Sequence, residues 1–446
     1  MNWAGLVLVS GCSAWICASA AVGSLYGLER RPAAKPYLQM PENENGPIPK
    51  LLSQTGAFQD LRSLTPSSAL LPYELIAPFW SDGAFKTRWV SVPHATKMGF
   101  APAGEWTFPA GTVFVKHFEL PTDPAQTASP RRLETRLLVR DSTGGVYGVT
   151  YKWRPDQTDA DLLTQSLTEP ILLRTTGGLR TQLWFYPSPA DCRTCHTTNA
   201  GGVLGVKTRQ LNRNFYYVAT QTTDNQLRTW NHLGLFEPRL NEADLSSLPR
   251  LTDPQDVHAA LELRSRSYLD ANCAQCHRPG GVVSHFDARF DTPLPQQNLI
   301  NGPVVIDQGI DNARAIAPND PWRSLILLRV NSLEPTKMPP LAHEIIDQRA
   351  VELLANWIHS LPGPPVLPPP AISPQAGQFK PGLKVALQHP DPAAEIRFTL
   401  NGNAPGKNSS LYKVPIELTG SATVRARAYK TNFTRSIAVQ ETFILE

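Results

Sequence analysis

Two short segments with the pattern Cys-x-x-Cys-His are the residues of this chain best suited to chemistry. They are Cys192-Arg193-Thr194-Cys195-His196 and Cys273-Ala274-Gln275-Cys276-His277. In this pattern the two thiols can add to the two vinyl groups of a haem, and the adjacent imidazole can bind the haem iron. The other cysteines of the chain, Cys12 and Cys17, lie near its start. The pattern therefore predicts two covalently bound haem c groups, with His196 and His277 as iron ligands.

Three other uses of the paired cysteines compete with haem attachment. A zinc site is disfavoured because the gap between Cys195 and Cys273 is far longer than in a zinc ribbon, and both histidines would be left without a role. A thioredoxin-like redox pair is disfavoured because no βαβ pattern surrounds either segment. A disulfide within one pair would be strained by its short loop. Haem attachment remains the favoured interpretation.

The second segment lies between two expected helices. One helix is expected over residues 256–271, directly before Cys273. The other is expected over 347–359, where Asp347 can cap the first turn and apolar residues recur at helical spacing. Between them, Met338 stands in the sequence Lys337-Met338-Pro339-Pro340, in a long stretch with no helical pattern.

This order of elements resembles class I cytochrome c over about residues 256–361. The resemblance implies His277 as the proximal ligand of the iron and Met338 as its axial ligand. It also implies that Tyr268 and Trp357 provide an aromatic contact between the first and last helices of this region.

The first segment has no such methionine, because none occurs between Met98 and Met338. The sixth ligand of the iron bound by His196 must therefore come from elsewhere, or the position stays open. His232, on a helix expected over 224–236, is the first choice. The alternatives are Met98, His94, His117, His258 and His285.

Strand-forming runs dominate the chain before the first segment. Residues 86–92 and 112–118 are rich in β-branched and aromatic side chains. Residues 133–140 and 146–154 flank Asp141-Ser142-Thr143-Gly144-Gly145, which is typical of a hairpin turn. Several strands at this spacing predict an antiparallel β-sandwich-like domain.

The start of the chain indicates export. Residues 3–26 carry no charge, and Glu29-Arg30-Arg31 follows them. Such a run is typical of a signal peptide, and it is long enough to remain as a membrane anchor. Lipidation at Cys12 and a buried core helix are the alternatives. We expect the rest of the chain to be periplasmic or otherwise exported.

A larger resemblance covers about residues 45–361. The segments that carry it are Pro78-Phe79-Trp80-Ser81-Asp82-Gly83-Ala84, the stretch Val203 to Asn212, Ala271 to His277, and Lys337-Met338-Pro339-Pro340-Leu341. These resemble an uncharacterised bacterial family of exported di-haem c-type proteins. Similar segments occur in or beside quinoprotein sugar dehydrogenases, which implies electron transfer and leaves the substrate open.

The tail, about residues 375–446, resembles the small β-sandwich appended to chitobiase and β-hexosaminidase enzymes. Residues 396–405 and 411–416 carry this resemblance, although Asn401 stands where an aspartate is usual. The module is an accessory domain and implies no glycosidase activity.

Together these patterns predict a multidomain α+β protein. The expected fold has an N-terminal β-sandwich-like domain, a mostly α-helical cytochrome c region with two haems, and a small C-terminal β-sandwich. The expected segments are 1–26 (signal peptide or membrane anchor), 27–56 (Pro-rich linker), 57–186 (β-rich domain), 187–255 (first haem c segment), 256–361 (class I cytochrome c-like domain), 362–374 (Pro-rich linker) and 375–446 (chitobiase-type β-sandwich).

The expected function is electron transfer by an iron-containing, metal-binding di-haem protein. The expected donor is a periplasmic quinoprotein-type dehydrogenase, and the expected acceptor is a cytochrome or oxidase. A net charge of +4, from 42 basic and 38 acidic residues, argues against a nucleic-acid partner. The alternatives are a di-haem peroxidase-like enzyme with an open or labile first haem, and a carbohydrate- or surface-binding haem protein.

Overall fold

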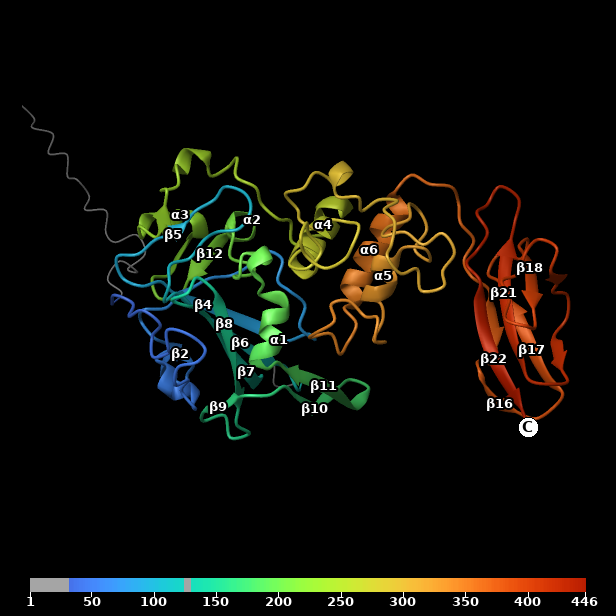
Figure 1. The fold of residues 1–446 in the computed structure, drawn as a ribbon, viewed down its shortest axis with the longest axis horizontal. Helices are drawn as coiled ribbons and strands as arrows, with labels where there is room; N and C mark the ends of the chain where they lie inside the picture. The colour runs from blue at the N-terminus through green and yellow to red at the C-terminus, as the bar shows by residue number, and fades with distance from the viewer. Residues whose placement is uncertain (1–31, 124–129) are drawn as a thin grey trace, which may run out of the picture.

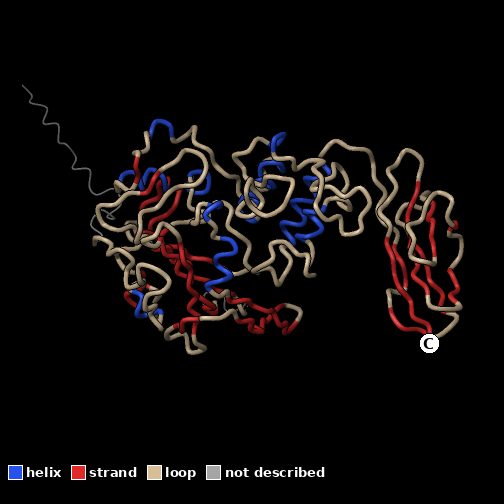
Figure 2. Tube along the Cα trace, in the orientation of Figure 1, coloured by secondary structure: helices blue, strands red, loops and turns tan. Residues whose placement is uncertain are grey.

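The computed structural model describes residues 32–123 and 130–446, which form mainly strands and long loops (Figures 1 and 2). This described part holds twenty-two strands and six α-helices. The predicted α+β class with a mostly helical cytochrome c region is therefore wrong, because the molecule is predominantly β. The expected signal peptide or anchor, 1–26, lies outside the described residues. Within the described residues, no helix has the length and apolarity needed to cross a membrane.

The region with the two cysteine segments contains only short helices, and loops make up most of it. The helices are α1 (Pro189–Cys195), α2 (Thr208–Leu211), α3 (Gln226–His232), α4 (Leu261–Asn272), α5 (Leu325–Val330) and α6 (Gln348–Ser360). Loops rich in proline and glycine, such as Pro279-Gly280-Gly281, replace helix between α4 and α5. The helix expected over 224–236 is instead divided. Strand β13 (Thr222–Asn225) precedes α3, and β14 (Phe236–Glu237) follows it.

A six-stranded antiparallel sheet organises the N-terminal half. Its strands, in spatial order, are β3 (Leu71–Pro72), β4 (Phe85–Ser91), β6 (Val113–Leu120), β7 (Arg131–Arg140), β8 (Val146–Trp153) and β9 (Ala160–Leu163). The predicted hairpin is confirmed, since β7 pairs with β8 across the expected turn. In that turn the Asp141 carboxylate accepts a hydrogen bond of 2.7 Å from the backbone N–H of Gly145.

The two faces of this sheet are covered by different parts of the chain. On one face, Trp89, Val115 and Leu137 are buried against the segment around Leu52. On the other face, Phe114 packs in a core that the later loops complete. Among the described residues, no second large sheet packs on this sheet. The expected β-sandwich is therefore wrong, and a single sheet is covered by loops, a hairpin and α1.

Several two-stranded elements surround the large sheet. They are β1 (Phe58–Asp60) with β2 (Thr65–Pro66), β10 (Leu167–Thr175) with β11 (Gly178–Tyr186), β12 (Asn214–Tyr217) with β13, and β5 (Met98–Gly99) with β14. The β10–β11 hairpin packs Trp184 and Tyr186 against Phe118 of the sheet.

Helices α4 and α6 pack together in the middle of the molecule (Figure 1). Asp347 caps α6 as predicted, because its carboxylate accepts a hydrogen bond of 3.2 Å from the N–H of Ala350. Tyr268 of α4 and Trp357 of α6 are buried in one core cluster with Leu354. The aromatic residues implied by the cytochrome c resemblance thus share a core, although the loops around them are not helical.

A two-layered β-sandwich forms the end of the chain. One sheet contains β15 (Ala371–Ser373), β17 (Leu383–Gln388) and β20 (Ile416–Leu418). The other contains β16 (Gly377–Phe379), β22 (Val439–Leu445), β21 (Ala422–Tyr429), β18 (Glu395–Thr399) and β19 (Ser410–Leu411). Val385, Val424 and Phe443 lie in its core. Asp311 of the preceding region accepts hydrogen bonds from Arg427 at 2.8 Å and Arg435 at 3.1 Å, which docks the sandwich there.

Candidate functional site

Helix α1 carries the first cysteine pair and lies on the large sheet. Ser188 caps this helix: its hydroxyl accepts from the N–H of Asp191, and its own N–H donates to the Asp191 carboxylate at 2.8 Å. Gly148 of β8 faces the helix, and a Cβ built there would lie 2.9 Å from the sulfur of Cys192. Glycine is needed at this position because any side chain would displace the thiol.

A cavity of about 210 Å³ lies between α1 and the sheet, and Cys192, Cys195 and His196 line it. The Nδ1–H of His196 donates to the backbone oxygen of Gly202 at 2.8 Å, which leaves Nε2 with a free lone pair. Burial lowers the pKa of His196 to about 4, so the imidazole is neutral at pH 7. A neutral, oriented imidazole is the form that binds a metal ion.

The sheet side of this cavity is positively charged. Arg88 on β4, Lys116 on β6 and Arg136 on β7 line it, and we call these three residues the cationic row. Burial is the main reason that the pKa of Lys116 falls well below its usual value, and the charge of Arg88 adds to the effect. Glu134 accepts from the Arg136 Nε at 3.0 Å.

The second cysteine pair lines a smaller cavity of about 40 Å³. Cys273 directly follows α4, and Cys276, His277 and Met338 line the same space. The His277 ring stacks on Phe286 with 4.5 Å between centroids and 12° between planes. Burial lowers the pKa of His277 to about 4. His277 and Met338, which the cytochrome c resemblance implies as iron ligands, therefore line one cavity.

The two cysteine segments meet in space although they are far apart in sequence. Cys195 lines the cavity of Cys276 as well as its own, and the interaction of the two thiols raises the pKa of Cys195 and lowers the pKa of Cys276 to about 7. Phe79, Cys195, Gln275 and Leu341 line both cavities. The four cysteines of the two segments carry free thiols in this structure.

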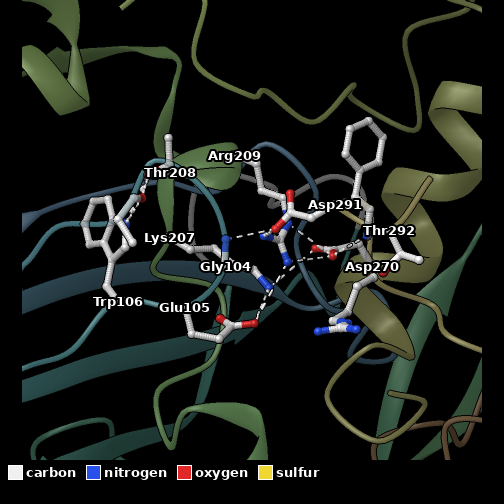
Figure 3. A network of polar contacts seen from close by, with 12 residues as sticks. Gly104, Glu105, Trp106, Lys207, Thr208, Arg209, Asp270, Asp291 and Thr292 are labelled. Carbon is white, nitrogen blue, oxygen red and sulfur yellow. Dashed lines mark hydrogen bonds and ion pairs between the residues drawn. The ribbon is translucent and has the colours of Figure 1, made fainter. Parts of the chain in front are cut away.

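A buried network of charged groups fixes the two segments relative to each other (Figure 3). Arg209 donates to Asp270 of α4 at 2.9 and 3.1 Å and also to Asp291. Glu105 accepts from Arg278, the residue after His277, at 2.8 Å, and from Lys207 at 3.3 Å. Burial acts to raise the pKa of Asp270, but Lys207 and Arg209 outweigh it and the pKa is lowered. The carboxylate is therefore ionised, and the ion pairs hold at neutral pH.

The Pro78–Ala84 segment, singled out in the sequence, docks the loop that carries Met338. The backbone N–H of Trp80 donates to the Asn272 side chain at 2.7 Å, at the end of α4. Asp82 accepts from the N–H groups of Glu344 and Ile345 at 2.8 and 3.0 Å. Burial raises the pKa of Asp82 to about 6 despite these two hydrogen bonds.

The structure brings none of the sixth-ligand candidates to the first cavity. His232 lies at the exposed end of α3, and His94, His258 and His285 are also exposed. Met98 is buried in the core beside Trp106. His117 points to the opposite face of the sheet, where its Nδ1 lies 2.8 Å from the Thr135 hydroxyl. Among the residues that line the cavity, His196 is the one imidazole and there is no thioether.

The cationic row was missed by sequence reasoning, although a signal for it exists. Arg88, Lys116 and Arg136 each lie within a predicted strand, next to one apolar residue. A charge at such a position faces one side of a sheet, but only the strand pairing shows that all three share that side.

The description of this protein as a metal-binding cytochrome c needs correction on two points. The described residues contain no group of three or more His, Cys, Asp or Glu side chains that could hold a metal ion. The comparison with protein families gives no cytochrome c match. The segment after α4 is therefore cytochrome c-like only in the order of a few elements.

The comparisons with known proteins identify one part of the chain. Residues 374–441 match the family described as the chitobiase/beta-hexosaminidase C-terminal domain. This match agrees with the resemblance drawn for the tail and with the observed β-sandwich. It is compatible with glycan contact by that domain. No curated protein matches the chain.

Proposed function

We propose that each cysteine segment binds one haem covalently and that the protein transfers electrons through the pair. What supports the proposal is that Cys195 lines the cavity of Cys276 as well as its own, because the two attachment points then adjoin. Bound haem supplies an iron that takes up and releases one electron. Thioether bonds would retain the group, so the attachment needs no cluster of several protein ligands.

The residues around each segment fit such a group. His196 and His277 are neutral imidazoles held by a hydrogen bond or a stacked ring. Met338 lines the cavity of His277 and would provide a thioether to the iron of a haem bound there. A thioether ligand favours the reduced iron relative to imidazole, so the second site should have the higher reduction potential. Electrons would then enter at the first site and leave at the second.

An exported electron carrier of this kind would exchange electrons with partner proteins. The proposed donor is a periplasmic quinoprotein-type dehydrogenase, and the proposed acceptor is a cytochrome or oxidase. The C-terminal sandwich would contribute contact with glycans or a cell surface, in line with its family match.

A peroxidase-like reaction at the first site is the second candidate function. The observation that favours it is the lining of the first cavity, in which His196 is the one imidazole and no thioether occurs. Two low-spin sites without peroxide turnover would exclude it. A high-spin first site with turnover would favour it over electron transfer.

The experiment that tests the proposal is a haem count by the pyridine haemochrome assay, in protein made with a haem-attachment system. We expect two haems per chain. The paired change Cys192→Ala and Cys195→Ala should leave one, and so should the paired change Cys273→Ala and Cys276→Ala. Thr194→Ala is the matched control, because Thr194 lies between two of the cysteines with an exposed side chain. Zinc with no haem in the wild type would contradict the proposal.

A further inference from the structure

Three positive charges lie side by side on the buried face of the large sheet. Arg88 is the direct cross-strand partner of Lys116, and Lys116 is the direct partner of Arg136. Neighbouring strands are about 4.8 Å apart, so the cationic row spans roughly 10 Å. Like charges directly opposite each other destabilise a sheet, and burial adds to the cost. An arrangement of this kind is expected to have an anionic partner.

The described residues supply only part of that partner. Glu134 accepts two hydrogen bonds from Arg136, one of them at 3.0 Å from Nε. Arg88 donates only to the backbone oxygen of Lys86, at 3.5 Å. Lys116 lies 4.7 Å from the centroid of the Phe118 ring, and neither it nor Arg88 forms an ion pair in the described part of the chain. Glu74 acts on Arg88 and Glu134 acts on Lys116, but neither carboxylate forms an ion pair with them. Two of the three side chains therefore have no paired anion among the described residues.

The cationic row faces the cavity into which the first cysteine pair opens. Cys192 contacts the sheet at Gly148 on β8, and the row extends from the neighbouring strand β7 away from that contact. Thiols and cations thus line different parts of one cavity of about 210 Å³. A haem has the matching arrangement, since its vinyl groups and its two propionates lie on different edges of the ring.

We propose that Arg88, Lys116 and Arg136 form a carboxylate-binding wall that takes the two propionates of the haem attached to Cys192 and Cys195. The inference rests on the proposed function. With Lys116 protonated beside a propionate, Glu134 and the two propionates together balance the three positive charges of the row. The wall therefore fixes which edge of the haem points toward the sheet.

The test compares the melting temperature of Lys116→Met in two forms of the full chain. One form is made with a haem-attachment system and the other without it. In the haem-free form, the substitution removes a buried amine whose charged form is disfavoured by burial and by Arg88, and it should raise the melting temperature by about 2–4 °C. In the haem-loaded form it removes a propionate partner and should lower the melting temperature by a similar amount. Lys116→Arg should restore the wild-type behaviour of the loaded form.

Lys152→Met is the matched control, because Lys152 lies on β8 and pairs with Glu169 at 3.1 Å. Its effect should have the same sign in both forms. A Lys116→Met effect of one sign in both forms would overturn the inference. A rise in the melting temperature of loaded wild type with succinate, absent in Lys116→Met, would also overturn it, because the wall would then bind a free dicarboxylate.

The haem count distinguishes failure of the proposed function from failure of the inference about the carboxylate-binding wall. Fewer than two haems in the wild type contradicts the proposed function and, with it, the inference. Two haems together with shifts of the same sign contradict the inference alone.

Discussion

The two Cys-x-x-Cys-His segments carry the same motif in very different surroundings. The first lies on a short helix against a β-sheet, in a cavity with three cations and no thioether. The second follows a helix of 12 residues, in a smaller cavity with Met338 and a stacked aromatic ring. The motif specifies attachment and one ligand. The surroundings determine the second ligand and the local charge, so the two sites should differ in potential and in what they bind.

The buried network between the two regions should give the largest effect when it is broken. Arg209→Met leaves Asp270 buried without its main partner and should reduce the free energy of unfolding by about 3–5 kcal/mol. Urea denaturation measures this change. Arg289→Met is the control, because its partner Asp287 is two residues away and Arg289 is about one-third exposed. That control should cost less than about 1 kcal/mol. Equal losses in the two variants would show that the network does not join the regions.

Loss of the Met338 thioether should reduce the difference in reduction potential between the two sites. Met338→Ala should abolish the near-infrared band of a thioether bound to ferric iron and lower one potential by on the order of 0.1 V, since axial ligands tune haem potentials over a wide range. A redox titration measures the potential. Met98→Leu is the control, because Met98 is buried in the core outside both cavities. Survival of the band in Met338→Ala would rule out this ligand.

Crowding the first site alone should affect only the first haem. Gly148→Ala places a methyl group 2.9 Å from the Cys192 sulfur, and such overpacking costs about 1–3 kcal/mol. We expect a haem count that falls from two toward one, while the site with Met338 keeps its spectrum. Gly177→Ala is the control, because the nearest atom to a Cβ there is 3.8 Å away. A loss at the second site instead would contradict the placement of α1.

The sequence predicts local features of this molecule well and long-range ones poorly. Asp347 caps α6, and the β7–β8 hairpin forms, because neighbouring residues determine both. The position of Cys195 in the lining of both cavities depends on the packing of separate regions, which no local pattern encodes. His232 was chosen by its distance along the chain, but strand β13 shortens the expected helix and leaves that side chain exposed.

The same limit applies to the class of the fold. Helix was expected around the second cysteine pair because the order of elements over about residues 256–361 resembled a helical family. That order fixes where α4 and α6 lie, and these two helices do pack together. It does not fix the loops between them, where frequent prolines remove backbone donors and prevent helix formation. The resemblance therefore extends to particular residues and not to the whole region.

The last effect is confined to acidic pH and comes from Asp82, which joins the first region to the loop of Met338. Burial raises its pKa in the folded protein to about 6, whereas an unfolded aspartate titrates near 4. Between these values the folded state binds more protons, so the free energy of unfolding falls as the pH rises from about 4 to 6, and Asp82 adds no further change above that. The total change should be about 3 kcal/mol.

Asp82→Asn should remove this slope, because an amide keeps one acceptor for the N–H groups of Glu344 and Ile345 and does not titrate. Urea denaturation at several values of pH measures the slope, and Asp256→Asn, at an exposed position, serves as the control. If docking of the loop also positions Met338, the variant should hold the potential of the second site constant between pH 4 and 6, where the wild-type potential drifts. If the free energy of unfolding depends on pH in Asp82→Asn as it does in the wild type, another group causes the dependence. The docking of the two regions would then not depend on the Asp82 carboxyl.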